Sequence, residues 1–176
     1  GCERCHGPGG SHMDAFPAEK PFRITRPDLL DADRANEVCA QCHARTEGHG
    51  TGLPFPYAEP GGLFLPGSTL DVFGSSQADL WPSGASAKPN GQADELAWSA
   101  HGPSGPYTLR CFDCHASHGT EQASVPLPAE LRQPTVDNTL CVNCHLGLTF
   151  DNDQAALEAH SAHFTYDPTG PASNSR

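Results

Sequence analysis

The sequence predicts a mostly irregular chain with a few short α-helices and little β-structure, folded around something other than its own side chains. Leu, Ile, Val and Phe number 29 of 176 residues, which is too few to fill the interior of a domain of this length. Gly and Pro together number 35, and the formal net charge is -11. Such a chain is disordered unless a non-protein group supplies the apolar core. The eight cysteines decide between these two outcomes.

All eight cysteines fall into four copies of the pentapeptide Cys-x-x-Cys-His. The first to fourth motifs are residues 2–6, 39–43, 111–115 and 141–145. This pentapeptide is the attachment signature of c-type haem. On a helical turn, positions i, i+3 and i+4 share one face, so two thiols can bond the haem vinyl groups while the histidine ligates iron.

The motifs therefore predict four covalently bound haem c groups as the cofactors. The attachment residues would be Cys2, Cys5, Cys39, Cys42, Cys111, Cys114, Cys141 and Cys144, and the proximal iron ligands His6, His43, His115 and His145. Four Cys-x-x-Cys pairs could also hold two zinc ions or form disulfide bonds. Neither use requires a histidine after the second cysteine, so the sequence strongly favours haem.

Six histidines lie outside the motifs and are candidates for the second axial ligand of iron. The only methionine is Met13, so bis-His ligation should dominate. His49 lies between two glycines and is the least constrained, so we leave it unassigned. The predicted distal ligands are His12, His101, His118, His160 and His163.

Four short helices are predicted, each near an aspartate that can cap its first turn. They are residues 34–43 after Asp31, 95–101 after Asp94, 139–145 after Asp137, and 154–163 after Asp151 or Asp153.

The middle of the chain, residues 50–106, is rich in Gly and Pro and is expected to be an ordered loop that wraps haem edges. Five aromatic side chains of this segment are available to pack on porphyrin: Phe55, Tyr57, Phe64, Phe73 and Trp81. Residues 164–176 are expected to form an extended tail. The length fits a single tetrahaem domain over residues 1–176.

Composition also excludes several classes of partner. No stretch of 18 consecutive apolar residues occurs, so no membrane span is predicted. The 21 acidic residues outnumber the 10 Lys and Arg, which argues against nucleic acid because nothing would neutralise phosphates. The chain starts at Gly1-Cys2 without a signal peptide, and we interpret it as a processed or truncated piece. Haem c is attached after export, so we expect an extracellular or periplasmic location.

Several stretches resemble multihaem c-type cytochromes. Residues 2–9 with His12 resemble the cytochrome c-554 type. Ser99-x-His101, followed by the third motif and His118, is similar to the repeat unit of periplasmic and outer-membrane multihaem electron carriers. His160-x-x-His163 resembles the stretch that precedes a further haem motif in such proteins. The resemblance touches all four motifs and implies a core of stacked haems with ligands that cross between neighbours.

The resemblance implies electron transfer rather than enzymatic catalysis, with redox proteins or extracellular acceptors as partners. Small multihaem chains of this kind also form conductive extracellular filaments, in which a histidine of one subunit can ligate a haem of the next. Carrier and homopolymer both stay open at this point. The alternative is a fragment or subunit of a multihaem oxidoreductase that acts on a small nitrogen or sulfur compound. No Cys-x-x-Cys-Lys motif is present, which counts against a nitrite-reductase-like active haem.

Overall fold

The computed structural model describes residues 1–49, 57–58, 62–77, 79, 81–82, 87, 91–118, 131–132 and 139–145. The chain divides into two compact units, Gly1–Asp113 and Cys114–Arg176. Within the described residues, one helix has 12 residues, the other helices have at most seven, and the strands have two or three. The predicted class of mostly irregular chain with short helices and little sheet is therefore confirmed for the described residues. No helix among them is long and apolar enough to cross a membrane.

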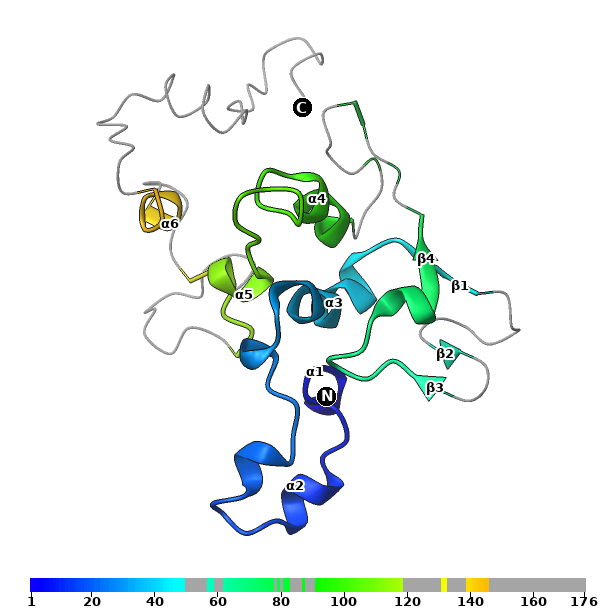
Figure 1. Cartoon of the computed structure of the whole chain (residues 1–176), viewed down its shortest axis with the longest axis vertical. Coiled ribbons are helices and arrows are strands. Elements are labelled where there is room, and N and C mark those ends of the chain that lie inside the picture. Colours follow the sequence, from blue (N-terminus) through cyan, green and yellow to red (C-terminus); the bar gives the residue numbers. More distant parts are fainter. Residues whose placement is uncertain are drawn as a thin grey trace. The chain divides into compact units, whose positions relative to one another are not determined.

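The elements carry the labels of Figure 1. In the first unit they are α1 (Glu3–His6), α2 (Gly10–Asp14), η1 (Lys20–Phe22), η2 (Pro27–Leu29), α3 (Ala32–His43), β1 (Thr46–Gly48), β2 (Tyr57–Ala58), β3 (Gly62–Leu63), η3 (Leu70–Val72), β4 (Gly74–Ser76) and α4 (Gln92–Trp98). α5 (Cys111–Cys114) crosses the boundary between the units, and α6 (Thr139–Val142) belongs to the second.

The longest helix, α3, is the central element of the first unit, with α4 on one side and α1 on another (Figure 1). It begins as predicted, because the Asp31 side chain accepts a hydrogen bond from the Arg34 N–H at 3.0 Å. Ala35, Val38 and Ala40 are buried. The second motif forms the last turn of this helix, so the fold fixes its cysteines and histidine on a regular backbone.

A small apolar cluster lies against α3. Phe64, Leu70 and Phe73 pack with Ala40, and the two phenyl rings meet edge to face with centroids 5.8 Å apart. The prediction that Phe64 and Phe73 are available to porphyrin is wrong for this structure, because they are only 3% and 8% exposed. These rings pack on each other because the chain folds η3 and the preceding loop back over α3.

Two small antiparallel sheets organise the middle of the chain. β1 pairs with β4, with Thr46 opposite Ser76 and Gly48 opposite Gly74, and β2 pairs with β3. A side chain at Gly74 would have its Cβ 2.5 Å from the Glu47 carbonyl oxygen, so this close pairing requires glycine. The β1–β4 pair ties the chain after α3 to the chain after η3.

The other predicted helices differ in extent from the observed ones. α4 begins at Gln92 and ends at Trp98, so the predicted helix 95–101 starts three residues late and His101 lies beyond its end. Asp94 does not cap this helix from outside, because it lies in the first turn and bonds to other segments. α6 starts at Thr139 as predicted but ends at Val142. The predicted helix 154–163 and tail 164–176 lie outside the described residues.

Candidate haem-attachment sites

Local backbone folding prepares the motifs for two-point attachment. In the first motif, the N–H groups of Cys5 and His6 bond to the Cys2 carbonyl at 3.1 and 3.0 Å, which closes one helical turn. The fourth motif repeats this, with Cys144 and His145 bonded to the Cys141 carbonyl at 3.2 and 3.0 Å. The second motif lies in α3, and both cysteines of the third lie in α5. The spacing therefore places the two thiols of each pair one turn apart, as attachment to one macrocycle requires.

The state of the cysteines bears on the two alternatives to haem, which are disulfide bonds and zinc binding. None of the eight is in a disulfide bond, and each is exposed or half-buried. Within the described residues, no three His, Cys, Asp or Glu side chains converge in a way that could hold a metal ion.

Two amide side chains of α3 hold the first motif and the start of the third beside the second motif. The buried Gln41 donates a hydrogen bond to the Arg4 carbonyl of α1 at 3.0 Å. Asn36 donates to the Leu109 carbonyl at 2.8 Å, and its side-chain oxygen accepts the Cys111 N–H at 2.8 Å. The 12-residue helix is therefore a common support for three of the four motifs.

The thiols of these three motifs also adjoin. A hydrogen bond between the Cys39 and Cys111 side chains, together with burial, raises the pKa of Cys39. Burial raises the pKa of Cys5, and the nearby thiols of Cys39 and Cys42 raise it further. Cys39 is thus next to Cys111 and close to Cys5.

Two histidines are held through the ring nitrogen that iron would not use. His6 Nδ1 lies 2.9 Å from the Thr25 carbonyl oxygen, and His12 Nδ1 lies 2.9 Å from the Lys20 carbonyl oxygen. A carbonyl only accepts, so Nδ1 carries the proton, and a metal would be ligated through Nε2. This second hydrogen bond is typical of metal-ligating histidines, because it fixes the tautomer and the ring orientation.

His43 and His49 form hydrogen bonds through different ring nitrogens. His43 Nδ1 lies 3.2 Å from the side-chain oxygen of Gln92, which again leaves Nε2 for iron. His49 uses Nε2 itself, at 2.6 Å from the Asp71 carbonyl oxygen. That bond occupies the nitrogen by which the other rings would ligate, so the structure gives no reason to assign His49 to iron.

For the remaining predicted ligands, the structure gives a location but no ring orientation. His101 follows α4 on an exposed turn, where its N–H bonds to the Ser99 hydroxyl at 3.1 Å. His115, His118 and His145 belong to the second unit, and His115 forms an isolated bridge with Leu131. His160 and His163 lie outside the described residues. The pairing of distal ligands with individual haems stays a prediction.

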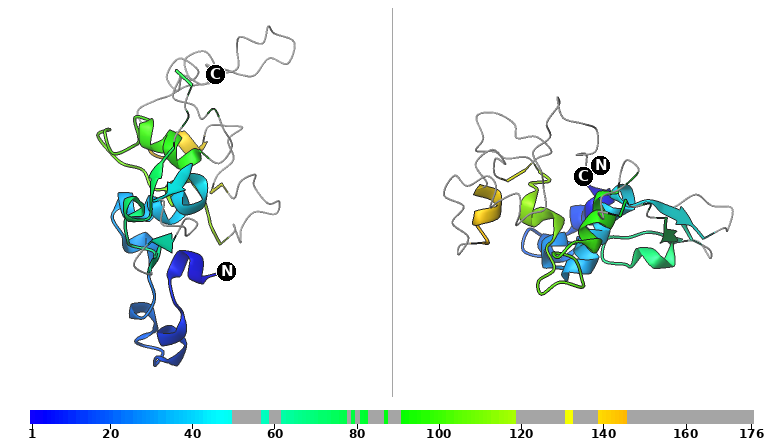
Figure 2. Two further views of the ribbon diagram at one scale, coloured as in Figure 1. Left: turned by 90° about the vertical axis from the view of Figure 1, so that its right-hand side faces the viewer. Right: turned by 90° about the horizontal axis from the view of Figure 1, so that it is seen from above.

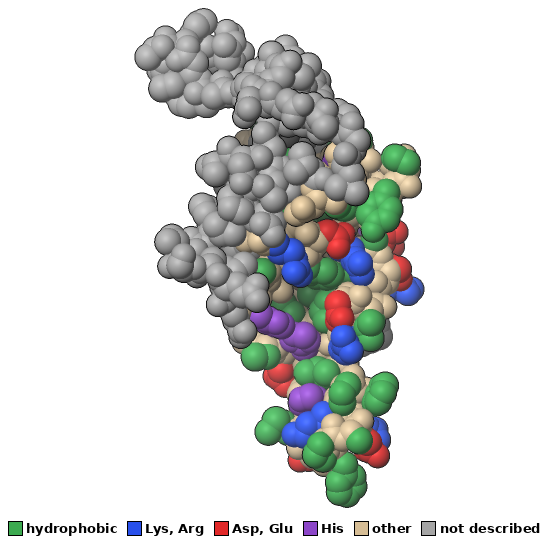
Figure 3. Space-filling model, turned by 90° about the vertical axis from the view of Figure 1, so that its left-hand side faces the viewer, with side chains coloured by type: hydrophobic (Ala, Val, Ile, Leu, Met, Phe, Trp, Pro, Cys, Tyr) green, Lys and Arg blue, Asp and Glu red, His purple; other side chains and the backbone are tan. Residues whose placement is uncertain are grey.

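Exposed apolar side chains provide the test of whether haem fits this chain. Among the described residues, the buried apolar core consists of six residues, whereas ten large apolar side chains are exposed. Residues 8–24 form an arm, with α2 and η1, that extends away from α3 (Figure 2). Histidines and hydrophobic side chains lie beside each other on one face of the surface (Figure 3). The ten exposed large apolar side chains are those of Met13, Phe16, Phe22, Leu29, Leu63, Leu65, Val72, Trp81, Trp98 and Tyr107.

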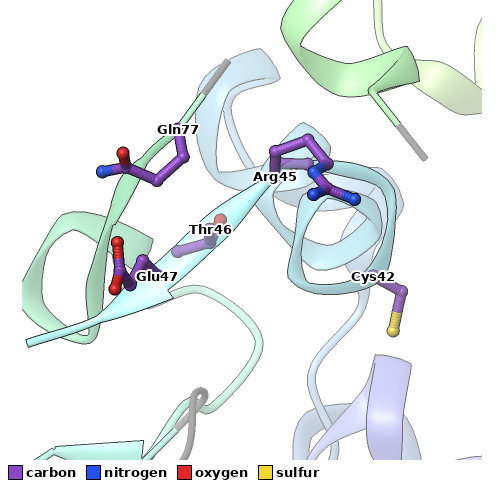
Figure 4. Close-up of a pocket in the computed structure, with 6 residues that line it drawn as sticks. Cys42, Arg45, Thr46, Glu47 and Gln77 are labelled. Atoms are coloured by element: carbon purple, nitrogen blue, oxygen red, sulfur yellow. The ribbon is translucent and has the colours of Figure 1, made fainter. Parts of the chain in front are cut away.

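A hollow of about 410 Å³ at the end of α3 offers a charged partner for haem carboxylates. It is lined by Cys42, Ala44, Arg45, Thr46, Glu47 and Gln77 (Figure 4). The guanidinium of Arg45 forms no ion pair in the described part of the chain. A guanidinium suits a propionate carboxylate because both groups are planar and can bond in pairs. The free thiols, the oriented histidines, the uncovered apolar surface and this cation all fit haem c.

Comparison with known proteins gives one informative likeness. No family model matches the chain, and no curated protein matches it. Among solved structures, the outer cell wall cytochrome OcwA aligns with a TM-score of 0.52 and 23% sequence identity. The alignment covers 82% of this chain and 37% of that protein, so the chain corresponds to little more than a third of its length. Over the aligned part, this chain shares its fold with that cytochrome.

Sequence reasoning did not find the residues that assemble this fold. Asn36, Gln41 and Gln92 are amides whose partners lie 37 to 75 positions away, and no local pattern indicates those partners. The one available signal was the presence of amides within and just before the second motif.

Glu37 gives a prediction on stability. The Leu70 N–H bonds to its carboxylate, but Glu37 Oε2 is buried without a partner. Burial is the main cause that raises the pKa of Glu37 above 4.5, with Asp71 and Asp33 adding to it. The native state therefore favours the protonated acid, and the associated stability is complete below pH 4.5 and is lost as pH rises through the raised pKa.

We expect Glu37→Gln to resist denaturant better than the parent at pH 7 and to show a flatter pH dependence. Denaturant midpoints of the haem-loaded protein at pH 4 and pH 7 measure this. The matched control is Asp14→Asn, an exposed carboxylate on α2 that is not among the charges acting on Glu37. A loss of stability in Glu37→Gln at pH 7 equal to that at pH 4 would contradict the prediction.

Proposed function

We propose that this chain is an electron-transfer protein that carries four haem c groups with mainly bis-His ligation. The observation that carries the proposal is that cysteines of three motifs meet at α3, where the side chain of Cys39 is hydrogen-bonded to that of Cys111 and lies close to Cys5. Thioether bonds at adjoining cysteines would bring the edges of successive macrocycles together. Electrons pass readily between redox centres that lie so close.

The residues have separate roles in this function. When bound, haem supplies a one-electron iron couple whose potential depends on axial ligand, burial and nearby charge. The cysteines of each motif would tether the group, and its histidine would ligate iron through Nε2. Thr25 and Lys20 hold the rings of His6 and His12 through their backbone carbonyls. Exposed apolar side chains such as Phe16 and Phe22 would cover the macrocycle and exclude water.

The location and the partners form part of the same proposal. The fold likeness to a cytochrome of the outer cell wall supports a site of action outside the cytoplasm, either extracellular or periplasmic. The net charge of -11 favours redox partners with basic surfaces, which it would attract over long range. A carrier and the repeating subunit of a filament both fit this function. Electron microscopy of the haem-loaded protein separates them, because a filament subunit polymerises and a carrier stays monomeric.

The test is the haem content and spin state of the protein made with haem attachment. We expect a mass increment of four haem c groups and a fully low-spin spectrum in both oxidation states. A high-spin component that binds carbon monoxide rapidly would instead favour the oxidoreductase alternative, which needs an open iron position. Absence of covalent haem would contradict the proposal and would favour zinc binding by the Cys-x-x-Cys pairs.

A further inference from the structure

The ring of His43 differs from the other oriented rings in the kind of group that holds it. The partners of His6 and His12 are backbone carbonyls, whereas the partner of His43 is the side-chain oxygen of Gln92, at 3.2 Å. Gln92 is the first residue of α4, 49 positions along the chain from His43. This contact therefore depends on how α4 is placed against the end of α3.

A buried carboxylate fixes that placement. Asp94, in the first turn of α4, is 8% exposed. It accepts the Arg45 N–H at 3.0 Å and the Ser76 hydroxyl at 2.8 Å. Gln92 and Asp94 share the first turn of α4, and Arg45 lies two residues after His43. The bond between Asp94 and Arg45 therefore ties the turn that carries Gln92 to the backbone beside His43. Two hydrogen bonds to a buried charge make this attachment rigid, and Gln92 is held in reach of the imidazole.

We propose that Gln92 is a positioning residue that orients His43 and lowers the reduction potential of the haem that His43 ligates. The inference rests on the proposed haem ligation. A hydrogen bond from Nδ1–H to an acceptor raises the electron donation of the imidazole, which stabilises ferric iron. Because the acceptor is a side chain, the potential of this haem is set by one residue that can be exchanged without altering the backbone.

Two substitutions at Gln92 should move the potential in opposite directions. Gln92→Leu removes the acceptor, and we expect about a tenfold shift of one haem's reduction equilibrium toward ferrous iron, about 59 mV. Gln92→Glu keeps an acceptor and adds negative charge, so the same haem should shift toward ferric iron. Spectroelectrochemical titration of the haem-loaded protein gives the potentials, and electron paramagnetic resonance g-values report the altered His43 ligand field.

The control for charge alone is Ala97→Glu, an exposed position on the same helix. It should shift the potentials less than Gln92→Glu and leave the g-values unchanged. Equal shifts in Ala97→Glu and Gln92→Glu, shifts of one sign in both Gln92 variants, or no shift in either would overturn the inference. Each of these outcomes presupposes a loaded, reducible protein, so a protein without covalent haem refutes the proposed function separately.

Discussion

A chain in which all eight cysteines are replaced by alanine is expected to remain unfolded. Burying one large apolar side chain contributes about 1.5–3 kcal/mol, while ordering each residue costs about 1–2 kcal/mol of backbone entropy. The described residues bury only six apolar side chains, three of which are Ala35, Ala40 and Val38. The apolar surface whose burial would offset this conformational entropy is instead exposed in the chain, where the macrocycles would cover it.

The measurement is far-UV circular dichroism with thermal melting, together with amide proton dispersion by nuclear magnetic resonance. We expect a coil spectrum, no cooperative transition and narrow dispersion for the eight-alanine chain. The control is the parent chain with its haems attached, which should melt cooperatively. A cooperative transition in the eight-alanine chain would show that the polypeptide holds its own fold, and the haem core would then not be the source of stability.

This expectation explains why the sequence predicted some parts of the fold and not others. The four motifs are local signals, and so is the cap of Asp31 on α3, because partners three or four residues apart are visible in the sequence. Phe64 and Phe73 were assigned to porphyrin because composition alone cannot say which aromatic rings meet each other. Their edge-to-face contact depends on the path of η3 back over α3, which no periodicity encodes.

The same reason applies at the site. Asp94 is typical of a helix cap, and its position before Glu95 predicted one. The structure uses it instead to join α4 to β4 and to the residue after α3, through Ser76 and Arg45. Helix ends were therefore predicted to within three residues, whereas the long-range polar contacts that place His43, Gln92 and the three motifs were not predictable.

Asn36→Leu is expected to destabilise the haem-loaded protein by about 2 kcal/mol and to loosen the third motif from the second. Leucine has the same branched skeleton but cannot form hydrogen bonds. It would leave the Leu109 carbonyl and the Cys111 N–H without their partners, and each unsatisfied group costs about 1–3 kcal/mol when buried and less when half-buried. Cys111 is the first residue of α5, so Asn36 acts as the cap of that helix from another segment.

Two variants at Asn36 distinguish a loosening of the third motif from the second from a general loss of stability. Asn36→Asp keeps an oxygen for the Cys111 N–H and loses only the donor to Leu109, so its loss in denaturant stability should be smaller than that of Asn36→Leu. The coupling between neighbouring haems, read as the splitting of the Soret circular dichroism band, should weaken in Asn36→Leu and persist in Asn36→Asp. If both variants lose stability equally while the splitting is unchanged, Asn36 contributes to folding but does not hold the motifs together. The closeness of Cys39 and Cys111 would then have to be maintained by the haems themselves.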